Sequence, residues 1–258
     1  MNISWMYKNL LENVSSITET FGTSDSDFGT NRLADNNLQS YWKTWGISPG
    51  PGTVANILFD MGSSVSVDSL IVIHNMNIGT LFFGAGGTNP SFGTADAFYG
   101  LAINGSTGTS INYLDSPVSF RYWKLFINGT NMSESTKIRE VFIGKRDELP
   151  INPEYPFRKE IEAFTILTES EKGQRAVYQK YTKQKWNFSY PAIDSATFGT
   201  LNKIRNFCNG SYKPLWFCID RAENKFETFF ARFLKNSYKH TEIMYGIHDI
   251  EFSLEEEI

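Results

Sequence analysis

The stretch "NRLADNNLQSYWKTWG", residues 31–46, decides how the first half of this chain is understood. Its first part is rich in asparagine and carries one acidic residue, Asp35, and its second part carries Trp42 and Trp45. Three interpretations are open: a metal-binding loop, a sugar-binding loop, or a turn that packs Trp42 into a core. The sequence around this stretch has to decide between them.

The composition fits a chain that buries one large core or two ordinary ones. Of its 258 residues, 41% are hydrophobic and 15% are aromatic. The 24 basic and 28 acidic residues are spread along the chain, which argues against sequence-specific nucleic-acid binding. No apolar stretch approaches the roughly 18 residues that a membrane span needs, and the N-terminus does not resemble a signal peptide. We therefore expect a soluble protein made in a cytoplasm, with Cys208 and Cys218 reduced and buried.

A proline-rich segment divides the chain. In "GKRDELPINPEYPF", residues 144–157, three prolines lie three residues apart among charged residues. Proline fixes φ and removes a backbone donor, so this segment is expected to be extended. The predicted organisation is an N-terminal arm (1–20), a first domain (21–148), a linker (149–157) and a second domain (158–258).

The first part reads as a β-sandwich. Five apolar runs bounded by turn residues predict strands at residues 55–62, 69–76, 98–105, 121–129 and 138–145. The glycine-rich segment 79–97 is expected to be a long loop, and loops of that length in compact domains are usually functional or mobile.

The second part combines strands with one helix. Strands are expected at 158–170, 183–193, 213–220, 225–234 and 242–256, with 171–182 separating the first two. Apolar residues at helical spacing predict a helix over 196–210 that Thr197 caps and that Asn209-Gly210 ends. The fold class is therefore mainly β, with two sandwich domains and one α-helix.

The sequence lacks the motifs of common enzymes. His74, His240 and His248 are not at zinc-ligand spacing, and there is neither an H-E-x-x-H motif nor a G-x-S-x-G elbow. The segment "GPGTVA", residues 50–55, leads into a strand rather than from a strand into a helix, so a dinucleotide site is not expected. We expect a protein that is not an enzyme.

The order of motifs in the first part resembles the galactose-binding-like, or discoidin-type, β-sandwich. The resemblance covers about residues 20–145 and implies a jelly-roll sandwich. The matching pieces are Ala34-Asp35-Asn36-Asn37 followed by Ser40 and Trp42, Phe59-Asp60-Met61-Gly62, Arg121-Tyr122-Trp123-Lys124, and Ile138-Arg139-Glu140-Val141.

In that family the loop before the tryptophan often holds calcium. The resemblance implies Asp35 and Glu140 as acidic ligands, with the backbone carbonyls of Leu33 and Leu38 nearby. Asn36 stands where the family usually has glycine, and asparagine tolerates the left-handed conformation that this turn needs. The alternative is that Asp35 only caps its own loop by hydrogen bonds.

The same resemblance implies sugar binding at loops of one end of the sandwich. Aromatic rings stack on the apolar faces of sugars, and polar side chains orient them. Core or interface packing is the alternative role for the aromatic residues among these candidates. The candidates are Trp45, His74, Asn75, Phe82, Phe83 and Tyr99.

The second part looks like tail proteins of long-tailed bacteriophages, of the distal-tail and minor-tail type. The resemblance covers about residues 155–258. It implies copies assembled in a ring, commonly a hexamer, around the tail tube. It also implies baseplate or hub proteins as partners, and assembly in the host cytoplasm into the virion tail. The residues that carry it are Lys183, Lys185, Trp186, Phe188, Leu201, Phe207, Gly210, Pro214, Trp216, Phe217, Asp220, Leu254 and Glu255.

The two resemblances together predict a structural component of a phage tail, without membrane insertion. Its discoidin-type domain would face outward and contact proteins or host surface glycans. The alternative function is a carbohydrate-binding, lectin-like adhesion module. The acidic residues Glu251, Glu255, Glu256 and Glu257 would line the tail lumen and repel DNA, or would simply be a solvated face.

Overall fold

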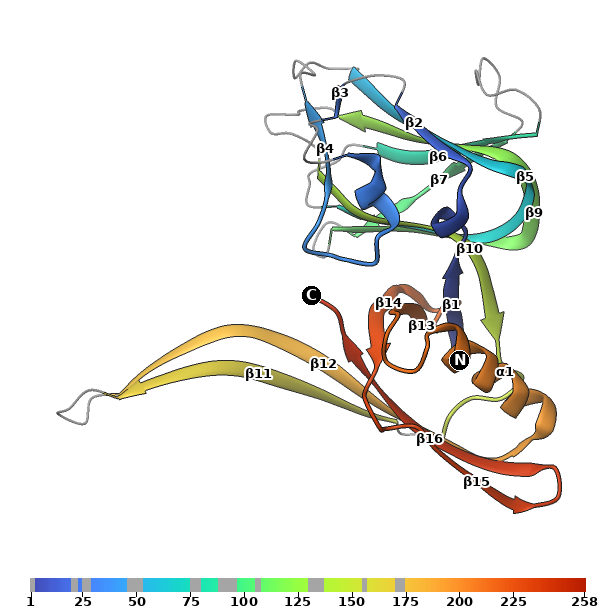
Figure 1. The fold of residues 1–258 in the computed structure, drawn as a ribbon, viewed down its shortest axis with the longest axis vertical. Helices are drawn as coiled ribbons and strands as arrows, with labels where there is room; N and C mark the ends of the chain where they lie inside the picture. Colours follow the sequence, from blue (N-terminus) through green and yellow to red (C-terminus); the bar gives the residue numbers. More distant parts are fainter. Residues whose placement is uncertain are drawn as a thin grey trace. The chain divides into compact units, whose positions relative to one another are not determined.

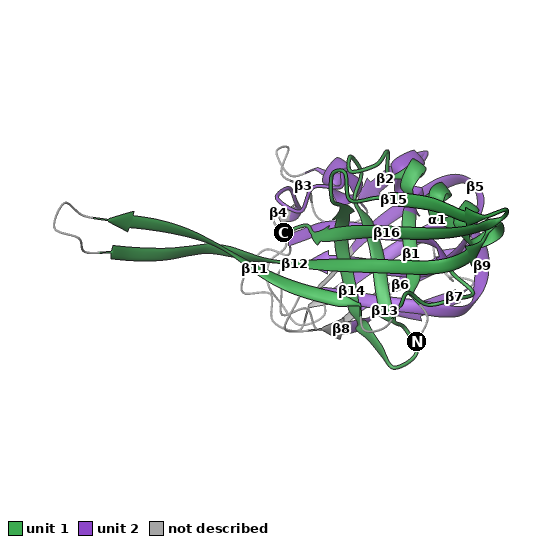
Figure 2. Ribbon diagram, turned by 90° about the horizontal axis from the view of Figure 1, so that it is seen from below, with its two compact units in different colours: residues 1–7, 148–258 green, residues 8–147 purple. Residues whose placement is uncertain are grey.

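The computed structural model describes residues 3–19, 23–24, 29–45, 53–74, 80–87, 97–104, 108–129, 137–154, 157–169 and 175–258. The chain divides into two compact units (Figure 2). Residues 8–147 form the inserted unit, and residues 1–7 and 148–258 form the terminal unit. The N-terminal residues are therefore not a separate arm: they are shared between the two units.

The inserted unit is built from β-strands and two short 3-10 helices. In its sheet β10, β5, β9, β6 and β7 are neighbours in that order, while β2 pairs with β5, β8 with β9, and β4 with β10 and β3. The elements are η1 (Leu10–Asn13), β2 (Ser16–Glu19), β3 (Thr23–Ser24), η3 (Thr30–Ala34), β4 (Trp42–Trp45), β5 (Thr53–His74), β6 (Thr80–Gly86), β7 (Ala97–Gly100), β8 (Ala102–Asn104), β9 (Thr109–Gly129) and β10 (Lys137–Glu148).

Two long strands turn this sheet into a sandwich. β5 and β9 pair along most of their length, and the register shifts between Asp60 and Val65, beside Gly62 with its φ of +74°. Before the bend β5 pairs with β2, and after it β5 pairs with β10. The first and second halves of the strand therefore lie in different layers, and side chains from both enter one buried core. This bend explains why two predicted strands, 55–62 and 69–76, are one strand.

The terminal unit is a β-sheet with the single α-helix of the described residues. Its strand order is β11, β12, β16, β14, β13 and β1, with β15 beside β16 (Figure 1). The elements are β1 (Ser4–Asn9), β11 (Arg158–Glu169), β12 (Arg175–Asp194), α1 (Ser195–Phe207), β13 (Leu215–Asp220), β14 (Asn224–Phe233), β15 (Lys239–Met244) and β16 (Ile247–Glu256). No described helix has the length and apolar character that a membrane span requires.

The core of the terminal unit is aromatic, and the first strand of the chain supplies its centre. Ser4–Met6 pair with residues of β13. The fully buried Trp5 ring lies 5.7 Å from Phe188, 5.9 Å from Phe217 and 5.8 Å from Phe252, between ring centroids. Offset and edge-on ring pairs of this kind stabilise a core beyond the area that they bury. Cys208 and Cys218 are both buried and unbridged, as predicted.

Several local predictions for this unit need correction. The helix is capped by the side chain of Asp194, which accepts a hydrogen bond from the Thr197 N–H, rather than by Thr197 itself. The helix ends as predicted: Asn209 and Gly210 both have positive φ. The segment predicted as one strand, 242–256, takes in the turn at Gly246 between β15 and β16.

The predicted separator, 171–182, is also largely strand. β12 begins at Arg175 and pairs with β11 up to Glu169, while it pairs with β16 only from Lys185 onward. Residues 161–169 and 175–184 therefore form a two-stranded ribbon that projects beyond the rest of its unit (Figures 1 and 2). The first strand of this ribbon lies within the predicted strand 158–170, whereas the second was missed because residues 175–182 have no buried face.

Candidate functional site

The predicted calcium loop forms a tight corner after η3. Asp35 accepts hydrogen bonds from the Asn37 N–H at 3.0 Å and from the Ser40 hydroxyl at 2.6 Å. Asn36 has a φ of +59°, so it takes the left-handed conformation expected of the residue that replaces glycine. Asp35 thus holds the turn by hydrogen bonds, which was the alternative to calcium binding, and these bonds leave further lone pairs on its carboxylate.

Glu140 on β10 is a buried carboxyl beside this corner. Its side chain is 1% exposed. Burial raises its pKa well above the usual range of a carboxyl, and the nearby charges of Asp35 and Glu12 raise the pKa further. Hydrogen bonds from the Asn36 N–H and from the Asn9 amide oppose this shift. The structure therefore brings together Asp35 and Glu140, which are far apart in the sequence.

Trp42 lies in the core next to this corner, where its strand pairs with β10. It is 1% exposed and belongs to the core of the inserted unit. Its indole N–H donates to the Glu19 carboxylate at 2.7 Å. Glu19 lies on β2, which pairs with the first half of β5, whereas Trp42 lies on β4, which pairs with β10. The packing role predicted for Trp42 is what the structure shows.

Asn9 is the residue of this site that sequence reasoning missed. Its amide N–H₂ donates to the Val141 carbonyl at 2.8 Å and to Glu140 at 3.4 Å. Its amide oxygen accepts from the N–H groups of Leu11 and Ile143. One buried side chain therefore joins the start of the inserted unit to β10. Sequence reasoning missed Asn9 because its partners on β10 lie more than a hundred residues away in the sequence.

The donors of this corner include one buried carboxylate oxygen without a partner in the described part of the chain. The Glu140 Oε2 atom is buried and has no hydrogen-bond partner among the described residues, and an orphaned carboxylate oxygen is costly unless a cation or a proton joins it. The described residues contain no group of three acidic, histidine or cysteine side chains that could hold a metal. Calcium, however, accepts backbone carbonyls and waters as most of its six to eight ligands. Asp35 and Glu140 therefore fit the ion as its two carboxylate donors.

The predicted sugar-binding residues are not gathered on one described surface. His74 is 2% exposed and its Nε2 lies 2.8 Å from the Ser110 hydroxyl, so its ring faces the interior, which removes it from a solvent-facing site. Asn75 and the side chains of Trp45 and Phe82 lie outside the described residues.

The remaining sugar-binding candidates are also aromatic. Phe83 is fully buried in the core. Tyr99 is half-buried, its ring stacks on Trp123 with centroids 6.0 Å apart, and burial raises its pKa. Packing in the core was the alternative to sugar binding for these aromatic residues. The structure shows this packing for Phe83, and Tyr99 is packed on one side only.

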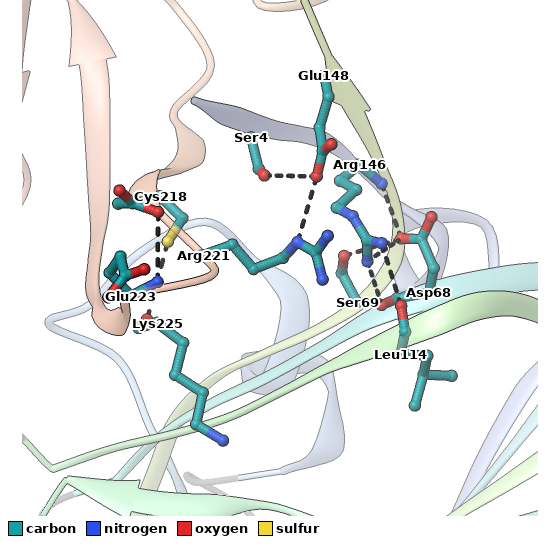
Figure 3. A network of polar contacts seen from close by, with 11 residues as sticks. Ser4, Asp68, Ser69, Leu114, Arg146, Glu148, Cys218, Arg221, Glu223 and Lys225 are labelled. Atoms are coloured by element: carbon teal, nitrogen blue, oxygen red, sulfur yellow. Dashed lines mark hydrogen bonds and ion pairs between the residues drawn. The ribbon is translucent and has the colours of Figure 1, made fainter. Parts of the chain in front are cut away.

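A buried ion pair of the inserted unit, Arg146 with Asp68, joins β10 to β5. Arg146 donates from its backbone N–H to Asp68 at 2.9 Å, and from its guanidinium to the carbonyls of Asp68 and Leu114 (Figure 3). Both side chains of this pair are less than a tenth exposed. Because every donor has a partner close by, this pair is a structural fastening rather than a site for a ligand.

A network of polar contacts lies next to β1 in the terminal unit. Glu148 accepts hydrogen bonds from Ser4 at 3.0 Å and from the guanidinium of Arg221 at 3.2 Å (Figure 3). These contacts join β1, the start of residues 148–258 and the turn between β13 and β14.

A cavity of about 420 Å³ also lies in the terminal unit. It is lined by Asn187, Phe188, Ser189, Ser237, Lys239, Glu251, Phe252 and Ser253.

The acidic end of the chain is neutralised by basic partners. Glu255 lies 2.9 Å from Lys183, Glu257 lies 2.6 Å from Arg232, and Glu251 lies 3.2 Å from Lys239. Glu256 accepts from the Gln184 N–H, and burial raises the Glu256 pKa. The Glu251–Lys239 pair is more than half exposed, as a solvated face predicts, whereas Glu255 and Glu257 are less than a third exposed; the lumen interpretation stays a prediction.

Comparison with known proteins gives likenesses in structure alone. No family model and no curated protein matches the sequence. A Ruminococcus gnavus GH29 fucosidase in complex with fucose is 17% identical, with a TM-score of 0.43 over 54% of this chain and 27% of the fucosidase chain. The module CpGH89CBM32-6 produced by Clostridium perfringens is 19% identical, with a TM-score of 0.38 over 54% of this chain and 99% of the module.

A third similar structure is a chitosan-binding module from a chitosanase/glucanase of Paenibacillus sp. IK-5. It is 13% identical, with a TM-score of 0.42 over 54% of this chain and 99% of the module. Each likeness takes in about half of this chain, and the fucosidase is matched over only 27% of its own length.

Proposed function

We propose that the inserted unit is a non-catalytic carbohydrate-binding module of the discoidin type. The observation that carries the proposal is the corner formed by Asp35, Trp42 and Glu140. The proposal is supported by the charge of Asp35 acting on the buried Glu140, and by the pairing of Trp42 with Ile138, two residues before Glu140. A corner fixed in this way can hold neighbouring loops in one conformation, and a preorganised loop binds its ligand at a lower entropic cost.

Calcium would be the structural ion of this module. Asp35 and Glu140 would hold it, with backbone carbonyls of the corner completing the oxygen shell. Its charge would compensate the buried carboxylate of Glu140, whose ionised form is otherwise disfavoured by burial and by the charge of Asp35. The ion supplies rigidity to the corner and takes no part in a reaction.

Calcium binding is tested by thermal unfolding of the full chain at pH 7.5 in chelator and in millimolar Ca²⁺. We expect Ca²⁺ to raise the melting temperature of the wild type, because a ligand that binds only the folded state stabilises it. Glu140→Gln should remove this response while it still folds, since the amide keeps the shape of the side chain. An equal response of wild type and Glu140→Gln would reject the ion at this corner.

The sugar ligand would contact Trp45, Asn75, Phe82 and Tyr99. The ligand class follows from the residue types: flat aromatic rings stack on pyranose faces, and an amide orients hydroxyl groups. We expect the full chain to bind one class of glycan on a glycan array, and Trp45→Ala to abolish this binding. The matched control is Phe98→Ala, at an aromatic residue of β7 that is 59% exposed and was not among the candidates. A blank array, or unchanged binding by Trp45→Ala, would reject the proposed ligand site.

A second candidate function, a ring-forming component of a phage tail, is favoured by the ribbon of the terminal unit. Its cross-strand pairs Ile166–Tyr178 and Leu167–Val177 are at least half exposed, and adjacent pairs on a ribbon point to opposite faces. A two-stranded ribbon with apolar side chains on both faces is marginal alone in water, and its edge is free to pair. Such a ribbon suits contact with another copy.

The ring is tested by the mass of the full chain in solution, measured by light scattering after size-exclusion chromatography. We expect a discrete oligomer for the wild type, and a monomer for the double variant Ile166→Ser with Tyr178→Ser. A wild type that stays monomeric at high micromolar concentration would reject self-assembly through the ribbon. The result is independent of glycan binding, so the two candidate functions can fail separately.

A further inference from the structure

Two of the three histidines of the chain meet in the terminal unit, although their spacing in the sequence matched no metal motif. The Nε2 atom of His240 on β15 lies 3.0 Å from the Nδ1 atom of His248 on β16. In the β15–β16 register His240 is opposite Ile250 and His248 is opposite Glu242, so the two rings are diagonal neighbours. Two imidazole nitrogens at this separation, on a rigid ladder, are the donors that transition metals prefer.

The hydrogen bonds around His248 favour one of its two neutral tautomers. The Ser195 hydroxyl donates to the Gly246 carbonyl at 3.3 Å, so its oxygen is left to accept. The His248 Nε2 atom lies 3.3 Å from that oxygen, which favours the tautomer with the proton on Nε2. In that tautomer the Nδ1 atom of His248 carries a lone pair on the side of His240. A hydrogen bond from the second ring nitrogen to a neighbouring oxygen is the support that metal-binding histidines usually have.

One aromatic ring holds both imidazoles in place. Phe198 stacks on His240 with centroids 4.3 Å apart and on His248 with centroids 4.2 Å apart. Phe198 lies in the first turns of α1, whose start is fixed by the Asp194 cap. His248 is buried and His240 is exposed, so the pair is rigid on one side and open to solvent on the other.

We propose that His240 and His248 form a binding site for a divalent transition-metal ion of the zinc class. The ion would bond Nε2 of His240 and Nδ1 of His248. Bonds of about 2.0–2.1 Å at angles between square-planar and tetrahedral place two nitrogens roughly 2.9–3.4 Å apart, which includes the observed separation. The proton that His240 carries on Nε2 moves to its Nδ1 through solvent exchange, so neutral imidazoles lose no proton when the ion binds.

The rest of the coordination shell would come from solvent or from a ligand. The described residues contain no third acidic, histidine or cysteine side chain within reach of this pair. Glu242, opposite His248 in the register, adds negative charge nearby, and its carboxylate accepts from the Gly246 N–H at 3.2 Å. Nitrogen donors select zinc, copper or nickel over calcium, so this site is chemically separate from the Asp35–Glu140 corner.

The test is a titration of the full chain, without a polyhistidine tag, with ZnCl₂ at pH 7.5 by isothermal calorimetry. We expect one equivalent of Zn²⁺ to bind, and His240→Ala to weaken binding at least about tenfold, because one of two protein donors is lost. His240 is exposed, so this variant should fold. The matched control is Thr241→Ala, at the next exposed residue of the same strand, which should bind as the wild type does.

A second measurement identifies the donors. Cu²⁺ bound to the wild type should show electron paramagnetic resonance couplings to two nitrogens, and Cu²⁺ bound to His240→Ala to one. The proposal is overturned by the absence of Zn²⁺ binding at millimolar concentration. It is overturned equally by equal affinities of wild type and His240→Ala, or by couplings that the variant does not change.

Discussion

The Glu140 corner of the inserted unit and the ribbon of the terminal unit depart from ordinary burial in opposite directions. At the corner a carboxyl lies in the interior and carries an oxygen with no partner among the described residues. On the ribbon, apolar side chains stand in solvent. Each arrangement has a free-energy cost for an isolated molecule, and each would be relieved by a different addition: a cation or proton at the corner, an apolar surface at the ribbon.

At both places the single chain leaves groups without the partners that would stabilise them. The two cores are packed with aromatic rings, although the indole N–H groups of Trp5, Trp123 and Trp186 and the Tyr190 hydroxyl are buried without a hydrogen-bond partner among the described residues. Departures from the inside–outside rule are concentrated at functional sites in proteins generally. We therefore expect the corner to stabilise the single chain and the ribbon to contribute little to its stability.

The largest expected effect is at Trp42. Trp42→Ala should destabilise the protein by about 3–5 kcal/mol, because it leaves a large cavity and removes the hydrogen bond to Glu19. Urea unfolding followed by circular dichroism measures this loss. Trp42→Phe, which keeps most of the buried area, should lose clearly less. If both variants unfold at the wild-type midpoint, Trp42 does not stabilise the core beside the corner.

Asn9 should follow with a smaller effect. Asn9→Ala should cost about 1–3 kcal/mol, since it leaves the Leu11 and Ile143 N–H groups without their acceptor in a buried place. The same urea titration measures it. Lys8→Ala, at an exposed neighbour on the same strand, is the control and should change little. An Asn9→Ala variant as stable as the control would show that solvent reaches these groups.

Glu140 should make the stability of the metal-free protein depend on pH. Its pKa is raised in the folded state, so the folded state binds the proton more tightly than the unfolded one does. Its contribution is complete below the unfolded pKa of about 4.3 and is lost as pH rises through the folded value. In chelator, the urea midpoint of wild type relative to that of Glu140→Gln should therefore decline from about pH 5 to pH 8. A parallel pH dependence of the two proteins would contradict this assignment.

The ribbon should show the smallest effect on the single chain. Leu167→Ser and Val177→Ser each remove an exposed apolar side chain, so unfolding measured at low protein concentration should change by less than about 0.5 kcal/mol. Solubility at high concentration should rise in both variants. A loss of several kcal/mol in the free energy of unfolding would mean that the ribbon is packed within the molecule. The ribbon would then stabilise the single chain as the corner does.

The sequence carried the fold class and part of the site, for identifiable physical reasons. Local features could be predicted because they follow from side-chain preferences. They include the burial of Trp42, the left-handed Asn36 and the helix end at Asn209-Gly210. The pairing of Asp35 with Glu140 came from a family resemblance. Long-range partners such as Asn9 with Val141 left no periodic signal to find.

Other errors came from applying one rule where another prevailed. The bend at Gly62 looked like the gap between two strands because a glycine among polar residues usually marks a turn. Only the second strand of the ribbon was missed: residues 175–182 looked like a separator because strand prediction relies on one buried face, and these residues have none. The histidine pair was invisible because its members come together only through the β15–β16 hairpin.

The division of the terminal unit across the two ends of residues 8–147 has a consequence for synthesis. Trp5 occupies the middle of an aromatic core whose other rings, such as Phe217 and Phe252, are translated much later. At about 5–20 residues per second, the inserted unit emerges whole on the ribosome while the first strand waits on the order of ten seconds for β13. Nascent chains should therefore gain a protease-resistant inserted unit first, with the exposed "SWMY" segment as the part that chaperones would have to shield.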